Sequence, residues 1–338
     1  MTTEAKIQLT STELGALWRA YITISGDNLI LDFLKDKTID IEAKNILTDS
    51  ITEYQNIKSR IVNLYNDQKT VIPIGFNERD VIMEAPPLFD DLFNIMYLRQ
   101  IMKLALGNCA IFFSMSYMEE VQNIVKLISD GANKYYAITT KYLLNKGVLA
   151  KPPYVTMPKT VEFIEDKNYM SGHNLFSEKR SLNTIEVGLL NEAIEDNIFG
   201  MQLMTGFAQV AKEKEVKKYF IEGKELSKKI ISKLSDVLLQ SDIQPPSTWA
   251  GRATDSTIAP FSDKLMMYMT SLIANTSISF TSLGTSFSMR SDLHAKLALI
   301  TKDSFDYSKK GGKIMIEYKW MEAPPQMEDR NQLTKIKE

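Results

Sequence analysis

Residues 89–153 read FDDLFNIMYLRQIMKLALGNCAIFFSMSYMEEVQNIVKLISDGANKYYAITTKYLLNKGVLAKPP, and residues 261–325 read FSDKLMMYMTSLIANTSISFTSLGTSFSMRSDLHAKLALITKDSFDYSKKGGKIMIEYKWMEAPP. The second segment aligns with the first at a constant offset of 172 positions and without a gap. Both segments begin on Phe-x-Asp, carry Ser-x-Ser in the middle and end on Pro-Pro, and the identical positions are Phe89/Phe261, Asp91/Asp263, Ile101/Ile273, Ser114/Ser286, Ser116/Ser288, Leu127/Leu299, Ile128/Ile300, Tyr135/Tyr307, Lys141/Lys313, Pro152/Pro324 and Pro153/Pro325. Ungapped self-similarity of this length indicates an internal duplication.

The region upstream of each segment carries the start signal of a helix. Thr10 followed by Glu13 has the spacing of a capping box, and an offset of 173 positions gives Asn183 and Glu186. Apolar residues then recur every three or four positions over residues 14–34 and 187–207. This pattern predicts the first amphipathic helix of each copy.

A heptad stripe predicts the second helix of each copy, and in the first copy it consists of Ala43, Leu47, Ser50, Tyr54, Ile57, Ile61 and Leu64. Ser50 aligns with Gly223, which suggests a close approach between helices at that level. Two more helices follow in each copy, over about 89–116 and 118–144, and over 261–288 and 290–318. Residues 277–281 alternate as a strand would, but the aligned residues 105–109 lie in an apolar run too long for a strand, so we predict helix in both.

The second and third helices of each copy are separated by long connections, residues 71–88 and 242–260. These connections are too long for adjacent antiparallel helices, but they can run the length of a bundle, as the crossover of ferritin-like folds does. We therefore predict an all-α chain of two tandem ferritin-like four-helix bundles. The bundles span residues 8–153 and 183–325, a linker covers 154–182, and a polar tail covers 326–338.

Proline and glycine pairs mark the expected ends of helices. The Pro-Pro pairs at 86/87, 152/153, 245/246 and 324/325 are interpreted as stops, because the residue before a proline disfavours helical geometry. Two of these pairs lie in the pentapeptide MEAPP, which we interpret as a terminator packed on the bundle end and not as a motif for a proline-binding partner. Gly311-Gly312 predicts a kink or an end in the last long helix.

Composition limits the partners and the compartment. Forty Lys and Arg residues against 42 Asp and Glu give a net charge of −2, which offers no electrostatic footprint for nucleic acid or an acidic membrane. The most apolar run, residues 92–118, contains Arg99, Gln100, Lys103 and Asn108, so it predicts a buried helix and not a membrane span. A single cysteine, Cys109, excludes an intramolecular disulfide, and the N-terminus lacks the layout of an export signal. We expect a cytoplasmic protein; a protein partner stays open.

A carboxylate-bridged metal pair is the chemistry that a ferritin-like bundle invites, and it needs Glu on two helices and Glu-x-x-His on the other two. His173 falls in the linker, and His294 has no Glu three residues before it. Asn28 and Asn197 are the polar residues that we place on the inward faces of the first helices. The partial pattern of Glu192, Glu195, Glu222 and Glu225 is interpreted as surface charge. The sequence therefore predicts no metal and no cofactor.

No catalytic residue is predicted either. Cys109 lies in a strongly apolar run and is interpreted as a core cysteine, and His294 is interpreted as a helix histidine bonded to a neighbour. Neither a Gly-x-Ser-x-Gly elbow nor a glycine-rich phosphate loop occurs. The Ser/Thr-rich residues 277–281 and the cluster Met266, Met267 and Met269 either fill the core or line a ligand site.

Several longer stretches resemble those of a known family, and they are Ser177-Glu-Lys-Arg180-Ser-Leu-Asn-Thr-Ile-Glu186, Gly206-Phe-Ala-Gln-Val210, Thr254-Asp-Ser-Thr257, Pro260-Phe-Ser-Asp-Lys-Leu-Met-Met267, Met289-Arg-Ser-Asp292 and Trp320-Met-Glu-Ala-Pro-Pro325. The chain resembles the tandem ferritin-like bundle proteins of spore-forming Gram-positive bacteria, a family classified by a domain of unknown function. The resemblance covers nearly the whole chain. It implies two four-helix bundles and a distant kinship to spore-coat proteins, and it brings no catalytic residues.

Two functional hypotheses follow. The first is a non-enzymatic structural or interaction protein made during sporulation or stress, because packing signals are present and catalytic constellations are not. The alternative is a ligand carrier or a degenerate metal-binding ferritin-like protein, for which His294, the Ser/Thr-rich helix and the methionines are the motivation.

Overall fold

A computed structural model describes residues 8–171, 180–246 and 252–335 of the chain. The first half forms four long helices, α1 (Ser11–Lys37), α2 (Ile41–Asp67), α3 (Asp91–Ser114) and α4 (Glu119–Asn145). The second half repeats them as α5 (Thr184–Val210), α6 (Lys214–Leu239), α7 (Asp263–Phe287) and α8 (Ser291–Glu317). Short helices lie at Glu78–Asp80 (η1), Lys167–Met170 (η2) and Arg330–Leu333 (α9).

Capping boxes start the first helix of each half. The side chain of Thr10 accepts a hydrogen bond from Glu13 N while the Glu13 carboxylate binds Thr10 N, and Asn183 and Glu186 form the same box at α5. The reciprocal bonds satisfy main-chain N–H groups that have no partner inside the helix. Both predicted helix starts are confirmed.

The Ser/Thr-rich stretch is helical, as predicted, since residues 277–281 lie inside α7. The hydroxyl group of Ser279 hydrogen-bonds back to the preceding turn, with its Oγ atom 2.9 Å from Asn275 O. Within the described residues the β-structure is limited to two isolated bridges. No helix among these residues is long and apolar enough to span a bilayer.

A carboxylate from a neighbouring helix starts four of the helices, and this explains the duplicated Phe-x-Asp motif. Asp91 accepts hydrogen bonds from the main-chain N–H groups of residues 39 and 40, at the start of α2, at 2.9 and 2.8 Å. Asp263 does the same for residues 212 and 213, at the start of α6. Glu13 and Glu186 bind the N–H groups that begin α4 and α8. Capping between helices therefore fixes their relative height in both bundles.

The second and fourth helices of each bundle end on residues in the left-handed region and not on the proline pairs. These residues are Lys69, Gly147, Asp242 and Lys319, with φ between 55° and 69°. Each comes at least three residues before the next Pro-Pro pair, and Pro86, Pro87, Pro152, Pro153, Pro324 and Pro325 are exposed. The interpretation of the prolines as packed helix stops is therefore wrong, because the left-handed residue already ends the helix.

The prediction that the last long helix ends at Gly311-Gly312 is wrong, since α8 continues to Glu317. Gly311 serves another purpose: a Cβ at this position would lie 2.3 Å from the Tyr219 hydroxyl on α6. Gly223 stands in the same relation to Tyr307, whose hydroxyl lies 2.2 Å from the position of an added Cβ. The close approach predicted at residue 223 is thus one between a helix backbone and a tyrosine ring.

Long crossovers join the second and third helices, at residues 68–90 and 240–262, which confirms the ferritin-like connectivity. The two crossovers also bind each other. Ile82 N donates to Pro260 O at 2.7 Å, and the equivalent Thr254 N donates to Leu88 O at 2.9 Å. At the offset of 172 positions Ile82 aligns with Thr254 and Leu88 with Pro260, so the two hydrogen bonds are equivalent. The two halves therefore contact each other through the same surface, as the subunits of a twofold dimer do.

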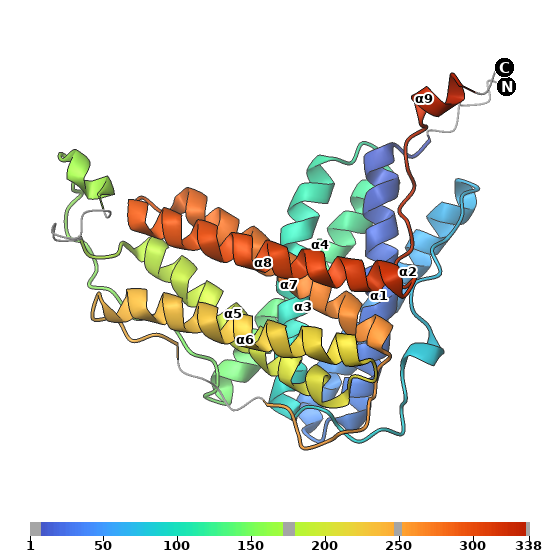
Figure 1. Cartoon of the computed structure of the whole chain (residues 1–338), viewed down its shortest axis with the longest axis horizontal. Coiled ribbons are helices and arrows are strands. Elements are labelled where there is room, and N and C mark those ends of the chain that lie inside the picture. Colours follow the sequence, from blue (N-terminus) through green and yellow to red (C-terminus); the bar gives the residue numbers. More distant parts are fainter. Residues whose placement is uncertain (1–7, 172–179, 247–251, 336–338) are drawn as a thin grey trace.

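The two bundles cross where α1 and α3 meet α5 and α7 (Figure 1). The rings of Phe93 and Phe199 stack with centroids 5.2 Å apart, and Phe33 meets Phe261 edge to face at 5.1 Å. The largest apolar cluster continues through this joint from one bundle into the other, and a smaller cluster fills the outer end of each bundle. The inner ends therefore share one core, whereas each outer end has its own.

Candidate functional site

A cavity of about 70 Å³ lies among the four helices of the first bundle. Most of its wall is aliphatic or aromatic, and this part consists of Ile24, Ile57, Ile101, Leu104, Phe112 and Ile128. Each helix also contributes at least one polar group: Asp27 from α1, Tyr54 from α2, Cys109 from α3 and Tyr135 from α4. An apolar chamber with a few convergent polar groups is the usual form of a small-molecule site.

Asp27 is the polar group at the centre of the bundle, and its side chain is only 1% exposed. The Tyr97 hydroxyl donates a hydrogen bond to Asp27 Oδ1 at 3.3 Å, and the Tyr54 hydroxyl also hydrogen-bonds to this carboxyl group. Burial raises the pKa of Asp27 to about 7, although the two tyrosine hydrogen bonds oppose that shift. Among the described residues, no cationic side chain forms an ion pair with Asp27.

The tyrosine hydroxyls and the thiol around Asp27 stay protonated at neutral pH. Burial, together with the nearby negative charge of Asp27, raises the pKa of Tyr54 and of Tyr97 well above the ordinary value. Burial raises the pKa of the Cys109 thiol to about 11. A thiol with a raised pKa is a poor nucleophile. Cys109 is a buried core cysteine, as predicted, and it also lines the cavity.

The rim of the cavity carries charge. Glu53 on α2 forms an ion pair with Lys134 on α4 at 3.3 Å. Gly131 makes room for the Glu53 carboxylate, since an added Cβ would lie 2.5 Å from its Oε1 atom. Arg19 also lines the cavity, eight residues before Asp27 and so about 12 Å further along α1. The two charged rim residues therefore lie apart from the buried carboxyl group.

The second bundle has a smaller cavity of about 50 Å³ at the equivalent place. Ile273 and Tyr307 line it, as the aligned Ile101 and Tyr135 line the first. The polar centre is different, because Gly200 stands at the position equivalent to Asp27, Ser227 at that of Tyr54 and Met269 at that of Tyr97. The second bundle forms without a carboxyl group at this position, so the fold itself does not require Asp27.

Neither centre fits a carboxylate-bridged metal pair. Such a pair needs four inward Glu side chains and two His, whereas one carboxylate close to its centre lines each cavity, Asp27 in the first and Asp196 in the second, and no histidine lines either among the described residues. Across the part of the chain that the structure describes, no three His, Cys, Asp or Glu side chains could hold a metal ion together. We derive no metal chemistry from either bundle.

The sequence analysis missed Asp27 and placed Asn28 at the inward position instead. Asn28 is 9% exposed and its Oδ1 atom has no hydrogen-bond partner among the described residues, but the adjacent Asp27 is buried more deeply. The inference that only neutral amides face the interior of the first helices is therefore wrong. Steps from Ile24 to Leu31 through either residue fit the helical repeat, so periodicity alone could not separate them. In α5 the predicted Asn197 is buried and donates to Ala193 O at 2.8 Å.

A second group of polar residues lies at the joint between the bundles. Arg99 on α3 forms an ion pair with Glu195 on α5, and Lys103 forms ion pairs with Glu192 and Asp196. The interpretation as surface charge is wrong for Glu195, whose side chain is 16% exposed, because α3 of the other bundle covers this part of α5. The side chain of Glu192 is 33% exposed and lies at the edge of the joint. For the remaining members of the partial pattern the interpretation is confirmed, since the side chains of Glu222 and Glu225 are 38% and 56% exposed.

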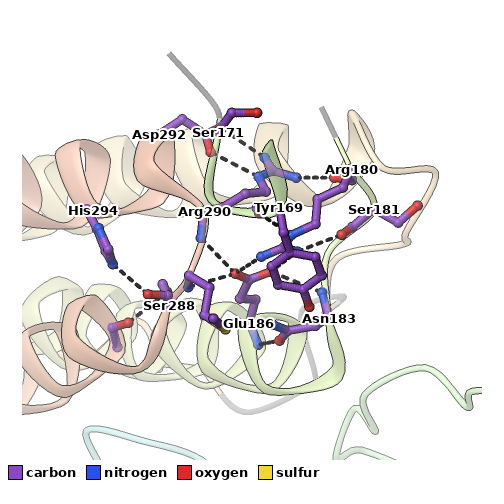
Figure 2. A network of polar contacts seen from close by, with 12 residues as sticks. Tyr169, Ser171, Arg180, Ser181, Asn183, Glu186, Ser288, Arg290, Asp292 and His294 are labelled. Atoms are coloured by element: carbon purple, nitrogen blue, oxygen red, sulfur yellow. Dashed lines mark hydrogen bonds and ion pairs between the residues drawn. The ribbon is translucent and has the colours of Figure 1, made fainter. Parts of the chain in front are cut away.

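The outer end of the second bundle holds a third polar network (Figure 2). Arg180 forms two hydrogen bonds to the carboxylate of Glu186, both at 2.8 Å, and the same carboxylate accepts from the N–H groups of Met289 and Arg290. Burial opposes ionisation, but Arg180 and the main-chain N–H groups lower the pKa of Glu186 to about 2. Glu13 binds the start of α4 in the same way, and its pKa is also about 2. This network is therefore a helix-capping device.

The remaining candidates have structural contacts. His294 Nε2 donates to Ser288 O at 2.6 Å, which confirms a helix histidine bonded to a neighbour (Figure 2). His173 lies outside the described residues. Met266, Met267 and Met269 are at most 1% exposed and belong to the shared core, so the core interpretation is confirmed. Of the Ser/Thr-rich stretch, Ser277 lines the second cavity.

The chain is similar to a family of proteins over most of its length and, weakly, to a solved structure. No curated protein matches the chain. A crystal structure from Bacillus halodurans C-125, described as a putative spore coat protein, matches with 18% identity and a TM-score of 0.39, over 45% of this chain and 98% of that one. That likeness is too low to carry an argument about function. The family match runs over residues 1–161 and 170–333, and the chain thus belongs to the family described as protein of unknown function (DUF3231).

Proposed function

We propose that the protein is a non-catalytic binding protein that holds a small, largely apolar molecule between the helices of its first bundle. The observation that carries the proposal is the cavity of about 70 Å³ with the buried carboxyl group of Asp27 in its wall. This is the alternative hypothesis of the sequence analysis, without its metal-binding variant.

The physical argument is that the cavity and its polar group both lower stability in the free protein. An internal void forfeits packing contacts, and a buried carboxyl group gives up its hydration. Tyr54 and Tyr97 compensate Asp27 only in part, since its pKa remains raised. A ligand that fills the void and hydrogen-bonds to Asp27 would recover both losses, so the free protein is preorganised for binding.

The chemistry of the wall supports binding and not catalysis. Burial holds the Cys109 thiol and the Tyr54 hydroxyl of the wall protonated, and also the hydroxyl of Tyr97, which hydrogen-bonds to Asp27. No histidine lines the cavity in the described part of the chain. A nucleophile with a base beside it, which covalent catalysis needs, is therefore absent among the described lining residues.

A neutral probe tests this function. In a methyl NMR titration of the full chain with 1-butanol, we expect saturable shifts of Ile57 and Met102, which line the cavity. Ala105→Leu places an isopropyl group in the first cavity and should abolish the shifts. Ser277→Leu makes the matched change in the second bundle and should leave them unchanged. Absence of saturable binding to the wild-type protein would refute the proposal.

A second candidate function, docking of another protein, is supported by exposed apolar side chains at the outer tips of both bundles. Ile111 and Tyr117 are 58% and 79% exposed, and the equivalent Leu283 and Met289 are 48% and 37% exposed. If the tips bind a partner in the cytoplasm of sporulating cells, Ile111→Ser with Tyr117→Ser should lose proteins that co-purify with the wild type. An unchanged set of co-purifying proteins would rule out this role.

A further inference from the structure

We infer that the first-bundle cavity takes a short aliphatic amine, whose ammonium group binds the Asp27 carboxylate while its hydrocarbon chain fills the apolar chamber. The inference rests on the proposed function and adds the chemical class of the ligand. It follows from three features of the cavity: the sign of its buried charge, the groups that face that charge, and the size of the chamber.

The buried charge selects a cation. Asp27 is 1% exposed and has no cationic partner among the described residues. A buried carboxylate is stabilised strongly by a cation that also donates hydrogen bonds, because the low polarity of the surroundings strengthens the attraction. An alcohol offers a hydrogen bond without the charge. A fatty acid would bring a second carboxylate next to Asp27 and Glu53, and this is unfavourable.

The groups that face Asp27 are neutral near pH 7, so Asp27 supplies the negative charge that a ligand cation would bind. Tyr54 on α2 and Tyr97 on α3 are its hydrogen-bond partners, and Cys109 on α3 and Tyr135 on α4 line the same cavity. The pKa values of all four groups are raised, by burial first, so they remain neutral near pH 7. The tyrosine rings can also attract an ammonium group through their faces.

The charged rim residues do not replace the ligand cation. Arg19 lies about two helical turns from Asp27 along α1 and contributes nothing to the shift of the Asp27 pKa. Glu53 is already paired with Lys134, and Gly131 leaves the space that its carboxylate occupies. A cation that enters the cavity therefore meets one buried carboxyl group and one paired carboxylate at the rim.

The size of the chamber selects a short chain. A cavity of roughly 150 Å³ accommodates benzene, and this one is about half as large. The enclosed space therefore takes about three non-hydrogen atoms, the ammonium nitrogen and the first carbons, and the rest of a four-carbon chain extends through the rim.

Binding also moves a proton. In the free protein Asp27 is partly protonated near neutral pH, and the ammonium group binds its ionised form, so the carboxyl proton is released to solvent. An alkylamine keeps its own proton up to about pH 10. With the pKa of Asp27 at about 7, the ionised fraction falls about tenfold from pH 8 to pH 6, and the apparent affinity for an amine should fall with it.

The experiment compares butylamine, 1-butanol and butyrate as probes of the full chain, in methyl NMR titrations at pH 8 and pH 6. For the wild type at pH 8 we expect butylamine to bind at least tenfold more tightly than 1-butanol, and butyrate not to bind. The affinity for butylamine should drop by up to tenfold at pH 6, whereas that for 1-butanol should stay within twofold. Asp27→Asn should remove the preference for butylamine over 1-butanol.

The outcomes distinguish a failure of the amine assignment from a failure of the proposed binding function. If 1-butanol binds and butylamine binds no more tightly at either pH, the cavity is a binding site but the amine assignment is wrong. If neither probe binds, the proposed function itself fails. The comparison of the probes on the wild-type protein needs no variant, so it decides the matter even where Asp27→Asn does not fold. Retention of the butylamine preference in a folded Asp27→Asn protein would also overturn the inference.

Discussion

Asp27 and Gly200 occupy equivalent positions in the duplicated bundles, but only the first bundle buries a carboxyl group there. The hydrogen-bond partners of Asp27 are also absent from the second bundle, because Ser227 and Met269 stand at the positions equivalent to Tyr54 and Tyr97. The first copy thus has a hydrogen-bonded polar centre, and the second has neither the carboxyl group nor the two tyrosines at the equivalent positions. At the scale of single residues, the two halves of the chain have different chemistry in one fold.

Asp27 should make the stability of the protein depend on pH in an unusual direction. Its pKa rises from 3.8 in the unfolded chain to about 7 in the folded one, so the folded state retains a proton that the unfolded state releases. Stability should fall as pH rises from about 4 to about 7, by on the order of 4 kcal/mol, and remain level above that.

Urea unfolding of the wild type and of Asp27→Asn at pH 5 and pH 8 checks this prediction. The variant carries a neutral side chain of similar shape, so it should not lose stability with pH at this site. The unfolding free energy of the variant minus that of the wild type should therefore be larger at pH 8 than at pH 5, by a few kcal/mol. A difference in unfolding free energy that is the same at both pH values would show that Asp27 does not carry a proton in the folded state.

The helices of each bundle are aligned by contacts between them and not only by packing. Glu186 and Asp263 bind the first N–H groups of α8 and α6, and Glu13 and Asp91 do the same in the first bundle. The aromatic pair of Tyr219 and Tyr307 fixes the distance between α6 and α8. Their rings stack with centroids 4.2 Å apart, and each hydroxyl lies over a glycine of the opposite helix.

Neighbouring glycines of α8 should therefore respond in opposite ways to the same substitution. Gly311→Ala places a Cβ 2.3 Å from the buried Tyr219 hydroxyl and should destabilise the protein by about 1–3 kcal/mol. Gly312 has nothing within 4 Å of an added Cβ, so Gly312→Ala should stabilise by about 0.5–1 kcal/mol through the higher helix propensity of alanine. Thermal unfolding measures both, and equal effects of the two substitutions would argue against the ring contact.

The elements of the fold were largely readable from the sequence. Capping boxes and three-to-four periodicity placed the helices to within a few residues, because these signals arise from local backbone hydrogen bonding and from burial of one face. The polar centre was not readable, since Asp27 and Asn28 fit the same stripe. The role of Gly311 was missed because it depends on Tyr219, a residue 92 positions away in the chain.

The whole molecule is organised by its joint, which the sequence did not predict. Arg99 and Lys103 interrupt an apolar run, and no acidic side chain of their own bundle forms an ion pair with them among the described residues. Their partners, Glu192, Glu195 and Asp196, come from the other bundle. The charged residues that interrupt this apolar helix indicated that a second bundle packs against it. The acidic residues with which they pair can be identified only once the two bundles are placed relative to each other.

Loss of one cation at the joint should be costly. Lys103→Met leaves Asp196, which is 5% exposed, without its ammonium partner, and we expect a loss of about 3–5 kcal/mol in unfolding free energy. Lys229→Met is the matched control, because the side chain of Lys229 is 57% exposed and its pair with Asp303 should contribute less than about 1 kcal/mol. Similar small losses for the two variants in urea unfolding would contradict a buried ion-pair joint.

The most direct test of the binding site is a crystal structure of the full chain grown with butylamine at pH 8. We predict electron density for the probe among α1, α2, α3 and α4, with its nitrogen within hydrogen-bond distance of the Asp27 carboxylate and its chain against Ile57 and Ile101. Density only at the protein surface or in the second bundle, with the first cavity unfilled, would contradict the account.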